Sequence, residues 1–218
     1  MKKQRKSYLP PSLILLSFLL WTLAVMLIDV KEIGPCGSSV GFATLNGFFH
    51  KLTGVHMTLY VITDWLSLIP IFFVMGFAVL GLIQWIKRKK LFRVDADILA
   101  LGVFYVAVLL TFIFFELFIV NYRPILIGGI LEASYPSSTT LIMMCVMPTA
   151  VMQLNKRIKH NFPRRSIAVL LIMFTVFAVL CRLISGVHWF TDIIGGALFS
   201  LGAVLAYYAV CVNIENGR

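Results

Sequence analysis

Long apolar stretches dominate the chain and recur at intervals that suit membrane-spanning helices. A helix needs about 20 consecutive apolar residues to cross the hydrocarbon core of a bilayer. Six stretches near that length are predicted as spans, at 11–29, 59–86, 98–120, 136–154, 166–184 and 190–212. Pro70 and Pro148 fall inside the second and fourth, where a proline can kink a helix. The pattern predicts an all-α, polytopic membrane protein with six transmembrane helices in one bundle, forming a single domain over residues 1–218.

The connection over residues 30–57 carries a weaker helical pattern between the first two spans. Phe42, Leu45, Phe49 and Leu52 recur at helical spacing, while polar residues such as His50 fall elsewhere around the turn. Two interpretations stay open. The segment is either a loop packed on the bundle or an interfacial helix beside a site at which a lipid substrate enters.

Composition supports the membrane assignment and argues against nucleic-acid binding. The chain is 60% hydrophobic and 13% charged, and its mean hydropathy is +0.95. A net charge of +10 would also suit a protein that binds nucleic acid. The basic residues, however, form clusters that adjoin the predicted spans, so membrane topology explains them better and no nucleic-acid partner is expected.

The basic residues also predict the orientation of the chain. Fifteen of the nineteen fall on one side of the membrane in the six-span arrangement, and by the positive-inside rule that side is cytoplasmic. Both termini are then cytoplasmic. The four basic residues on the other, extracytoplasmic side are Lys31, Lys51, Arg123 and Arg182.

Several ionisable residues lie at the outer ends of spans, where charge is unfavourable unless it faces a polar site. Arg123 and Arg182 carry guanidinium forks that match phosphate oxygens, although a single arginine at a helix end can also extend to the lipid headgroups. His188 and Asp192 are four residues apart and share a helix face. We expect the carboxylate to accept a hydrogen bond from the imidazole and leave the other ring nitrogen available for attack or proton transfer. The alternative is a structural His–Asp cap.

The start of the fourth span has the features of an anion-binding helix terminus. Pro136 suits the first helical position, which leaves the amides of Ser137, Ser138 and Thr139 pointing outward at the positive end of the helix dipole. The alternative is an ordinary capped helix start. Because a short loop joins this region to Arg123, we expect both to contribute to one phosphate-binding site.

These segments resemble a known family. Tyr122-Arg123-Pro124, Tyr135-Pro136-Ser137-Ser138 and the spacing Arg182-x5-His188-x3-Asp192 are similar, in this order, to the three motifs of the type-2 phosphatidic acid phosphatase superfamily. The resemblance implies that His188 attacks phosphorus and forms a phosphohistidine, and that Asp192 orients it. It also implies that Arg123, Ser137 and Arg182 bind the phosphate oxygens and that neither a metal nor another cofactor is required.

Three positions depart from the motifs of that family. Glu116 stands where the first motif has a lysine, Thr139 where the second has a histidine that acts as the acid, and Cys181 where the third has a serine. A threonine hydroxyl is far too weak an acid to protonate a leaving alkoxide. Either the substrate is a lipid diphosphate, whose leaving group needs less acid assistance, or Glu132 or Glu116 acts as a surrogate acid.

Three functions remain open from the sequence. The first is an extracytoplasmic lipid phosphatase acting on phosphatidic acid, phosphatidylglycerophosphate or a polyprenyl diphosphate. The second is a phosphotransferase on the same scaffold, which passes the phosphoryl group to an acceptor other than water. The third is a catalytically silent phospholipid-binding or transport protein. The retained Arg182, His188 and Asp192 favour an enzyme, because a protein that only binds lipid has little need of an oriented imidazole.

Overall fold

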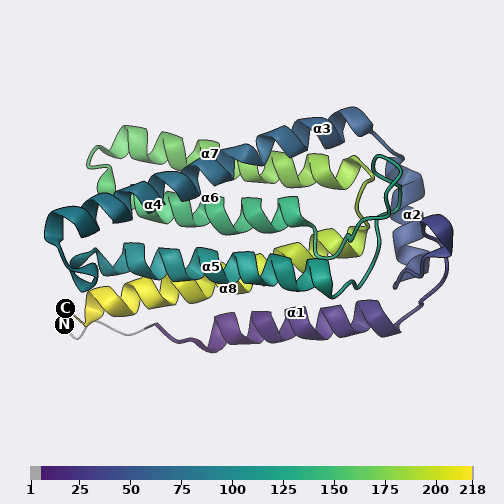
Figure 1. Ribbon diagram of the computed structural model, residues 1–218, viewed down its shortest axis with the longest axis horizontal. Helices are drawn as coiled ribbons and strands as arrows, with labels where there is room; N and C mark the ends of the chain where they lie inside the picture. The colour runs from purple at the N-terminus through teal and green to yellow at the C-terminus, as the bar shows by residue number, and fades with distance from the viewer. Residues whose placement is uncertain (1–5, 218) are drawn as a thin grey trace.

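The chain forms a bundle of long helices with shorter helices at one end (Figure 1). The computed structural model describes residues 6–217. Its α-helices are α1 (Leu9–Leu27), α2 (Ala43–Thr53), α3 (Met57–Leu66), α4 (Leu68–Arg88), α5 (Ala96–Leu117), α6 (Ser138–Arg157), α7 (Asn161–Ile184) and α8 (Phe190–Asn216), and two 3₁₀ turns are η1 (Pro35–Gly37) and η2 (Leu91–Arg93). Among these residues no segment forms a β-strand, so the all-α prediction is confirmed.

Five segments are long and apolar enough to cross a membrane. They are α1, the α3–α4 pair taken as Met57–Arg88, α5, α7 and α8, and the mean hydropathy of their most apolar windows lies between 1.9 and 2.8. The predicted multi-pass membrane protein is therefore confirmed. The fourth predicted span, 136–154, coincides with α6, which is not among these five segments, so a count of six stays a prediction.

The low hydropathy of α6 follows from its position in the middle of the bundle. It packs against α4, α5, α7 and α8 (Figure 1), and ten of its twenty residues are buried. Its side chains therefore face protein rather than lipid, and polar ones are tolerated where they find partners. Thr149 Oγ1 donates to the Cys145 carbonyl at 2.8 Å, and Gln153 bonds to the Tyr207 hydroxyl of α8.

The second predicted span is interrupted at one residue near Pro70, as expected for a proline in a helix, and consists of α3 and α4. The break lies at Ser67, three residues before Pro70. Proline has no N–H to give to the carbonyl four residues earlier, and its ring crowds that carbonyl. Here the carbonyl belongs to Leu66, the last residue of α3. The proline thus accounts for a break that separates the short α3 from the long α4.

The connection over residues 30–57 contains α2, so its helical pattern is confirmed as a helix. This helix is also packed on the bundle, since Phe49 stacks on Phe190 of α8 with ring centroids 4.0 Å apart. The buried Asn46 side chain donates to Thr191 Oγ1 at 2.9 Å and accepts from the Thr191 amide at 3.1 Å. Both contacts fix α2 against the first turn of α8.

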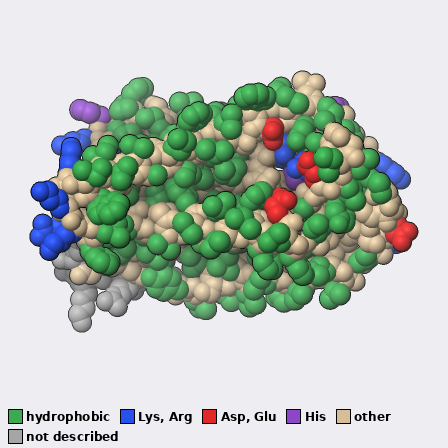
Figure 2. Space-filling model, viewed as in Figure 1, with side chains coloured by type: hydrophobic (Ala, Val, Ile, Leu, Met, Phe, Trp, Pro, Cys, Tyr) green, Lys and Arg blue, Asp and Glu red, His purple; other side chains and the backbone are tan. Residues whose placement is uncertain are grey.

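The two ends of the bundle differ in charge. The end of α8 and the α4–α5 and α6–α7 connections meet at one end, here called the basic end, where the chain ahead of α1 also lies, since the Lys6 amide donates to Asn213 Oδ1 (Figure 1). Basic side chains gather there, while the flank of the molecule is mostly hydrophobic (Figure 2). The α5–α6 and α7–α8 connections, which carry the residues expected to bind phosphate, lie at the opposite end, here called the site end (Figure 1).

Candidate active site

The α7–α8 connection holds His188 in a fixed, buried position. Gly186 adopts a φ of +67°, and a Cβ there would lie 1.9 Å from the carbonyl oxygen of Gly54, so only glycine fits this close approach. The amide of His56 donates to the Ser185 carbonyl at 2.9 Å. These contacts fasten the connection to the segment between α2 and α3. As a result His188 is only 4% exposed.

One nitrogen of His188 is hydrogen-bonded and the other is not. Nδ1 lies 3.1 Å from the Ser134 carbonyl oxygen, which can only accept, so Nδ1 carries the proton. Nε2 is buried without a hydrogen-bond partner among residues 6–217. The Nδ1–H tautomer leaves the lone pair on Nε2, which is the arrangement that a nucleophilic imidazole requires.

The expected direct hydrogen bond between His188 and Asp192 is not present, and that prediction is wrong. Their closest atoms, Nδ1 and Oδ2, are 3.8 Å apart. Ser134 Oγ lies between them, 3.1 Å from the histidine nitrogen and donating to the carboxylate at 2.5 Å. The helical spacing did bring the two residues near each other, but the imidazole turns toward the backbone of the α5–α6 connection.

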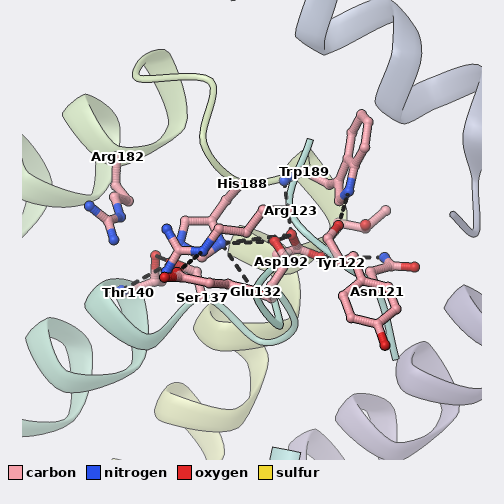
Figure 3. A network of polar contacts seen from close by, with 12 residues as sticks. Asn121, Tyr122, Arg123, Glu132, Ser137, Thr140, Arg182, His188, Trp189 and Asp192 are labelled. Carbon is pink, nitrogen blue, oxygen red and sulfur yellow. Dashed lines mark hydrogen bonds and ion pairs between the residues drawn. The ribbon is translucent and has the colours of Figure 1, made fainter. Parts of the chain in front are cut away.

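Asp192 is fully buried and receives three hydrogen bonds. The donors are Ser134 Oγ at 2.5 Å, the Trp189 amide at 2.8 Å and Asn121 Nδ2 at 3.4 Å (Figure 3 shows the last two). A carboxylate with these donors is held in one orientation. Ser134 and Asn121 were not among the predicted site residues. Both adjoin the recognised motifs, and this proximity was the only signal available.

Ser134→Ala is expected to lower kcat by about 10- to 100-fold with little change in KM, because the hydroxyl orients His188 and Asp192 without reaching the phosphate. The measurement is steady-state phosphate release by the purified variant. Ser134→Thr keeps the hydroxyl and should retain more activity than the alanine variant. Ser166→Ala, near the basic end of α7, is the matched control and should match wild type. Equal activity of Ser134→Ala and wild type would contradict this role.

Two buried arginines from different elements approach His188. Arg123 lies in the α5–α6 connection and Arg182 in the last turn of α7, and they are 8% and 1% exposed. Arg123 Nη1 and Arg182 Nε are buried without a partner among residues 6–217, whereas Arg123 Nε forms an ion pair with Glu132. Figure 3 shows Arg123, Arg182 and His188 gathered above the first turn of α6. Unpaired buried donors are rare because they are unfavourable, so this cluster has the properties of an anion site.

The first turn of α6 forms the floor of this region, although not in the predicted register. The first helical residue is Ser138 rather than Pro136, and Ser137, just before the helix, accepts at Oγ from the Thr140 amide at 3.4 Å. The Ser137 amide donates to the Asp192 carbonyl at 3.1 Å and is therefore occupied. The amides of Ser138 and Thr139, at the first two helical positions, have no partner within the helix. The predicted anion-binding helix start is thus displaced by two residues.

The environment of His188 favours its neutral form. Burial lowers the pKa of this imidazole well below its usual range, and the positive charges of Arg182 and Arg123 lower it further. The Ser134 carbonyl acts in the opposite direction but does not outweigh them. At neutral pH His188 is therefore uncharged, with its Nε2 lone pair available.

The pH dependence of kcat/KM should reflect this lowered pKa. A histidine with its usual pKa of about 6.5 would become protonated as the pH falls through that value. We expect activity to persist through pH 6.5 and to fall only at lower pH, where the imidazole finally gains a proton. Titration of the lipid phosphate, followed by ³¹P NMR on the same micelles, separates the ionisation of the substrate from that of the enzyme. An acid limb at or above pH 6.5 after this correction would be inconsistent with a lowered pKa.

The comparison with protein families decides the classification. The family model of the PAP2 superfamily matches residues 100–215. The chain belongs to the PAP2 superfamily. A comparison with curated protein sequences finds no significant match. Among solved structures, the chain is similar to the crystal structure of the first transmembrane PAP2-type phosphatidylglycerolphosphate phosphatase from Bacillus subtilis, with a TM-score of 0.65 and 18% identity over 94% of this chain and 96% of that one.

In this PAP2 protein the carboxylates near the arginines occupy different surroundings. Glu132 lies with Oε2 3.1 Å from Arg123 Nε, and its carbonyl accepts from the Arg123 amide at 3.0 Å. Glu116, in place of the lysine of the first motif, has no such partner among residues 6–217 and lines a small pocket with Ser138 and His188. Figure 2 shows acidic and basic side chains together in a hollow near the site end. Of the two candidate surrogate acids, Glu116 is the one that lines a pocket together with His188.

Thr139 faces an apolar cavity that adjoins this pocket. The cavity has a volume of about 520 Å³ and is lined by α3, α4, α5 and α6. Along α6 it extends from Ser138 to Val146, a rise of about 12 Å at 1.5 Å per residue. The apolar cavity and the small pocket beside His188 share Phe112 and Ser138 in their walls.

Among residues 6–217, no three His, Cys, Asp or Glu side chains lie together as a metal site would require. The donors that surround the anion site are guanidinium groups and amides. These groups complement phosphate oxygens directly.

Proposed function

We propose that this PAP2-superfamily protein is a metal-independent lipid phosphatase that forms a phosphohistidine on His188. The observation that carries the proposal is the cluster of buried atoms without a hydrogen-bond or ion-pair partner among residues 6–217: His188 Nε2, Nη1 of Arg123 and Nε of Arg182. Two guanidinium groups and a helix start can bind the non-reacting phosphate oxygens, while a neutral imidazole faces the same region.

The reaction proceeds in two displacement steps. In the first, the lone pair of His188 Nε2 attacks phosphorus, and the bond from phosphorus to the leaving oxygen of the lipid breaks with its electron pair on that oxygen. The leaving oxygen takes up a proton from an acid or from water. In the second, water attacks the phosphohistidine, the P–N bond breaks, and inorganic phosphate and the neutral imidazole result. Asp192, through Ser134, keeps Nδ1–H directed at the Ser134 carbonyl throughout.

The apolar cavity supports an amphiphilic substrate. A hydrocarbon chain seated between α4, α5 and α6 would place its phosphate at the first turn of α6, because Ser138 and Thr139 line the cavity at that end. We take the substrate class to be a lipid phosphate or a polyprenyl diphosphate. The protein from Bacillus subtilis is named as a phosphatidylglycerolphosphate phosphatase, which falls within this class.

The membrane arrangement that we propose has six spans, with α6 crossing inside the bundle. The termini and the basic end face the cytoplasm by the positive-inside rule, and the site faces the opposite side. A polar group is not tolerated among lipid chains unless it is satisfied within the protein. Because its neighbours shield α6 from lipid, α6 is the span that can carry polar residues.

Labelling with a membrane-impermeant thiol reagent in intact cells tests this orientation. Cys36, exposed in η1 at the site end, should react in wild type and the signal should disappear in Cys36→Ser. In that background Ile130→Cys, at a position 65% exposed in the α5–α6 connection, should restore labelling. Phe92→Cys, at a position 94% exposed at the basic end, should react only after lysis. The reverse pattern would overturn the topology.

Phosphate release from a panel of lipids by the purified protein in detergent tests the activity. We expect release that persists in EDTA. Transfer of the phosphoryl group to an added alcohol without release of inorganic phosphate would identify the phosphotransferase alternative. Lipid binding without turnover of any member of the panel would identify the silent binding or transport alternative.

A further inference from the structure

Helix α3 forms a wall of the anion site that no motif indicates. The guanidinium of Arg182 donates from Nη1 to the Tyr60 carbonyl at 3.5 Å and to Thr63 Oγ1 at 3.2 Å. Its Nη2 lies 3.9 Å from Asp64 Oδ1. These contacts cover one edge of the guanidinium and leave Nε, on the other edge, without a partner. The α3 helix therefore sets the direction in which Arg182 presents its remaining donor.

The aromatic ring of Tyr60 contacts both arginines. Its centroid lies 4.7 Å from the guanidinium carbon of Arg182 and 5.8 Å from that of Arg123. Both distances fall within the range of about 6 Å for a cation–π interaction. Among the hydrogen bonds, ion pairs and ring contacts of residues 6–217, this ring is the group shared by the two guanidinium groups.

Two guanidinium groups held close together repel each other, and the repulsion is stronger where water is excluded. Arg123 and Arg182 are both buried, so solvent screens them poorly. The negative face of an aromatic ring attracts both charges and offsets part of the repulsion. Asp64 is a weaker partner, because its side chain is 61% exposed and lies 3.9 Å from Arg182.

We propose that Tyr60 is a positioning residue for phosphate binding, which holds Arg123 and Arg182 together in the orientation that the phosphate oxygens require. The inference rests on the proposed function, since it assigns the two arginines to a phosphate. Tyr60 acts through them and does not touch the reacting atoms. Its effect should therefore appear in affinity for phosphate and not in the chemical step.

The first test compares Tyr60→Phe, which keeps the ring, with Tyr60→Leu, which keeps an apolar side chain without a π face. We expect Tyr60→Phe to remain within about twofold of wild type. Tyr60→Leu should raise both KM and the inhibition constant of inorganic phosphate about tenfold, with kcat changed less than threefold. Trp65→Leu is the matched control, because Trp65 is on the same helix but 70% exposed, and it should match wild type.

A second test is independent of any change in side-chain size. The series starts from Tyr60→Phe, in which the phenylalanine is then replaced by analogues that carry one, two or three fluorines on the ring. Each fluorine weakens the negative face of the ring while its shape is nearly kept. The inhibition constant of inorganic phosphate should rise stepwise with each fluorine. A flat series, or equal loss in Tyr60→Phe and Tyr60→Leu, would overturn the role of the ring. If inorganic phosphate does not inhibit wild type at all, the phosphate site itself is wrong, which is a failure of the proposed function and distinct from these outcomes.

Discussion

Replacing His188 with alanine is expected to reduce phosphate release by at least ~10⁴-fold, because the reaction loses its nucleophile. The protein should stay folded. The substitution leaves the Ser134 carbonyl without one donor, which costs about 1–3 kcal/mol for a buried group and is small beside the packing of the helix bundle. The measurement is release of inorganic phosphate by variant and wild type at equal concentration, with thermal unfolding in detergent as the check on folding.

Three comparisons sharpen this result. Labelling with a ³²P-phosphate lipid should trap an acid-labile phosphoprotein in wild type and none in His188→Ala. Asp192→Asn should be less severely impaired than His188→Ala, because it disturbs positioning and leaves the attacking atom in place. His160→Ala, at an exposed histidine of the basic end, is the control and should behave as wild type. Substantial turnover by His188→Ala would show that another residue attacks phosphorus.

Spacing along the sequence predicted proximity in this site better than it predicted hydrogen bonds. The interval from His188 to Asp192 does bring the two side chains to one place, since their polar atoms are 3.8 Å apart. The partner of the imidazole is nevertheless Ser134, which is 54 residues earlier in the chain. Helical periodicity describes neighbours within one helix. It contains no information on a loop that folds across the start of that helix.

The contribution of α3 could not have been predicted for a similar reason. Tyr60 and Thr63 stand in an apolar stretch that reads as an ordinary membrane span. The hydrogen bond from the His56 amide to the Ser185 carbonyl ties the start of α3 to the end of α7, which carries Arg182, and no spacing in the sequence indicates it. Arg182 itself was predictable, because a charge at the end of a span is rare and marks a polar site. Tyr60 and Thr63 are uncharged and carry no such signal, whereas Asp64, the charged partner of Arg182 inside the second predicted span, does carry one.

Hydropathy predicted the outer helices more surely than the central one. Segments that face lipid must be apolar, so α1, α5 and α7 are evident from composition. A helix surrounded by protein is released from this requirement, and α6 accordingly carries buried Thr140, Thr149 and Gln153. The same burial that lowers its hydropathy places its first turn beneath the arginines. The helix with the weakest membrane signal is thus the one that carries the second motif.

The leaving group should distinguish lipid diphosphates from monoesters in this protein. A monoester leaves as an alkoxide and needs a proton, whereas a diphosphate leaves as a stable phosphate anion, so the loss of the motif histidine at Thr139 should affect monoesters more. We expect wild type to prefer diphosphates. Thr139 lines the cavity proposed to hold the lipid. In an in-line displacement the leaving oxygen lies on the side of the phosphorus opposite the attacking His188. An acid introduced at position 139 would therefore lie on the side of the leaving group.

Restoring that acid is the decisive experiment. Thr139→His should raise kcat for a lipid monoester by about 10²-fold and change diphosphate turnover far less, since general acid catalysis contributes about 10²–10⁴-fold where it is needed. Glu132→Gln should alter affinity for phosphate rather than this ratio, because Glu132 is paired with Arg123. Glu116→Gln should have little effect on either substrate. If wild type instead cleaves monoesters as fast as diphosphates and Glu116→Gln removes that activity, then Glu116, which shares a pocket with His188, is the acid.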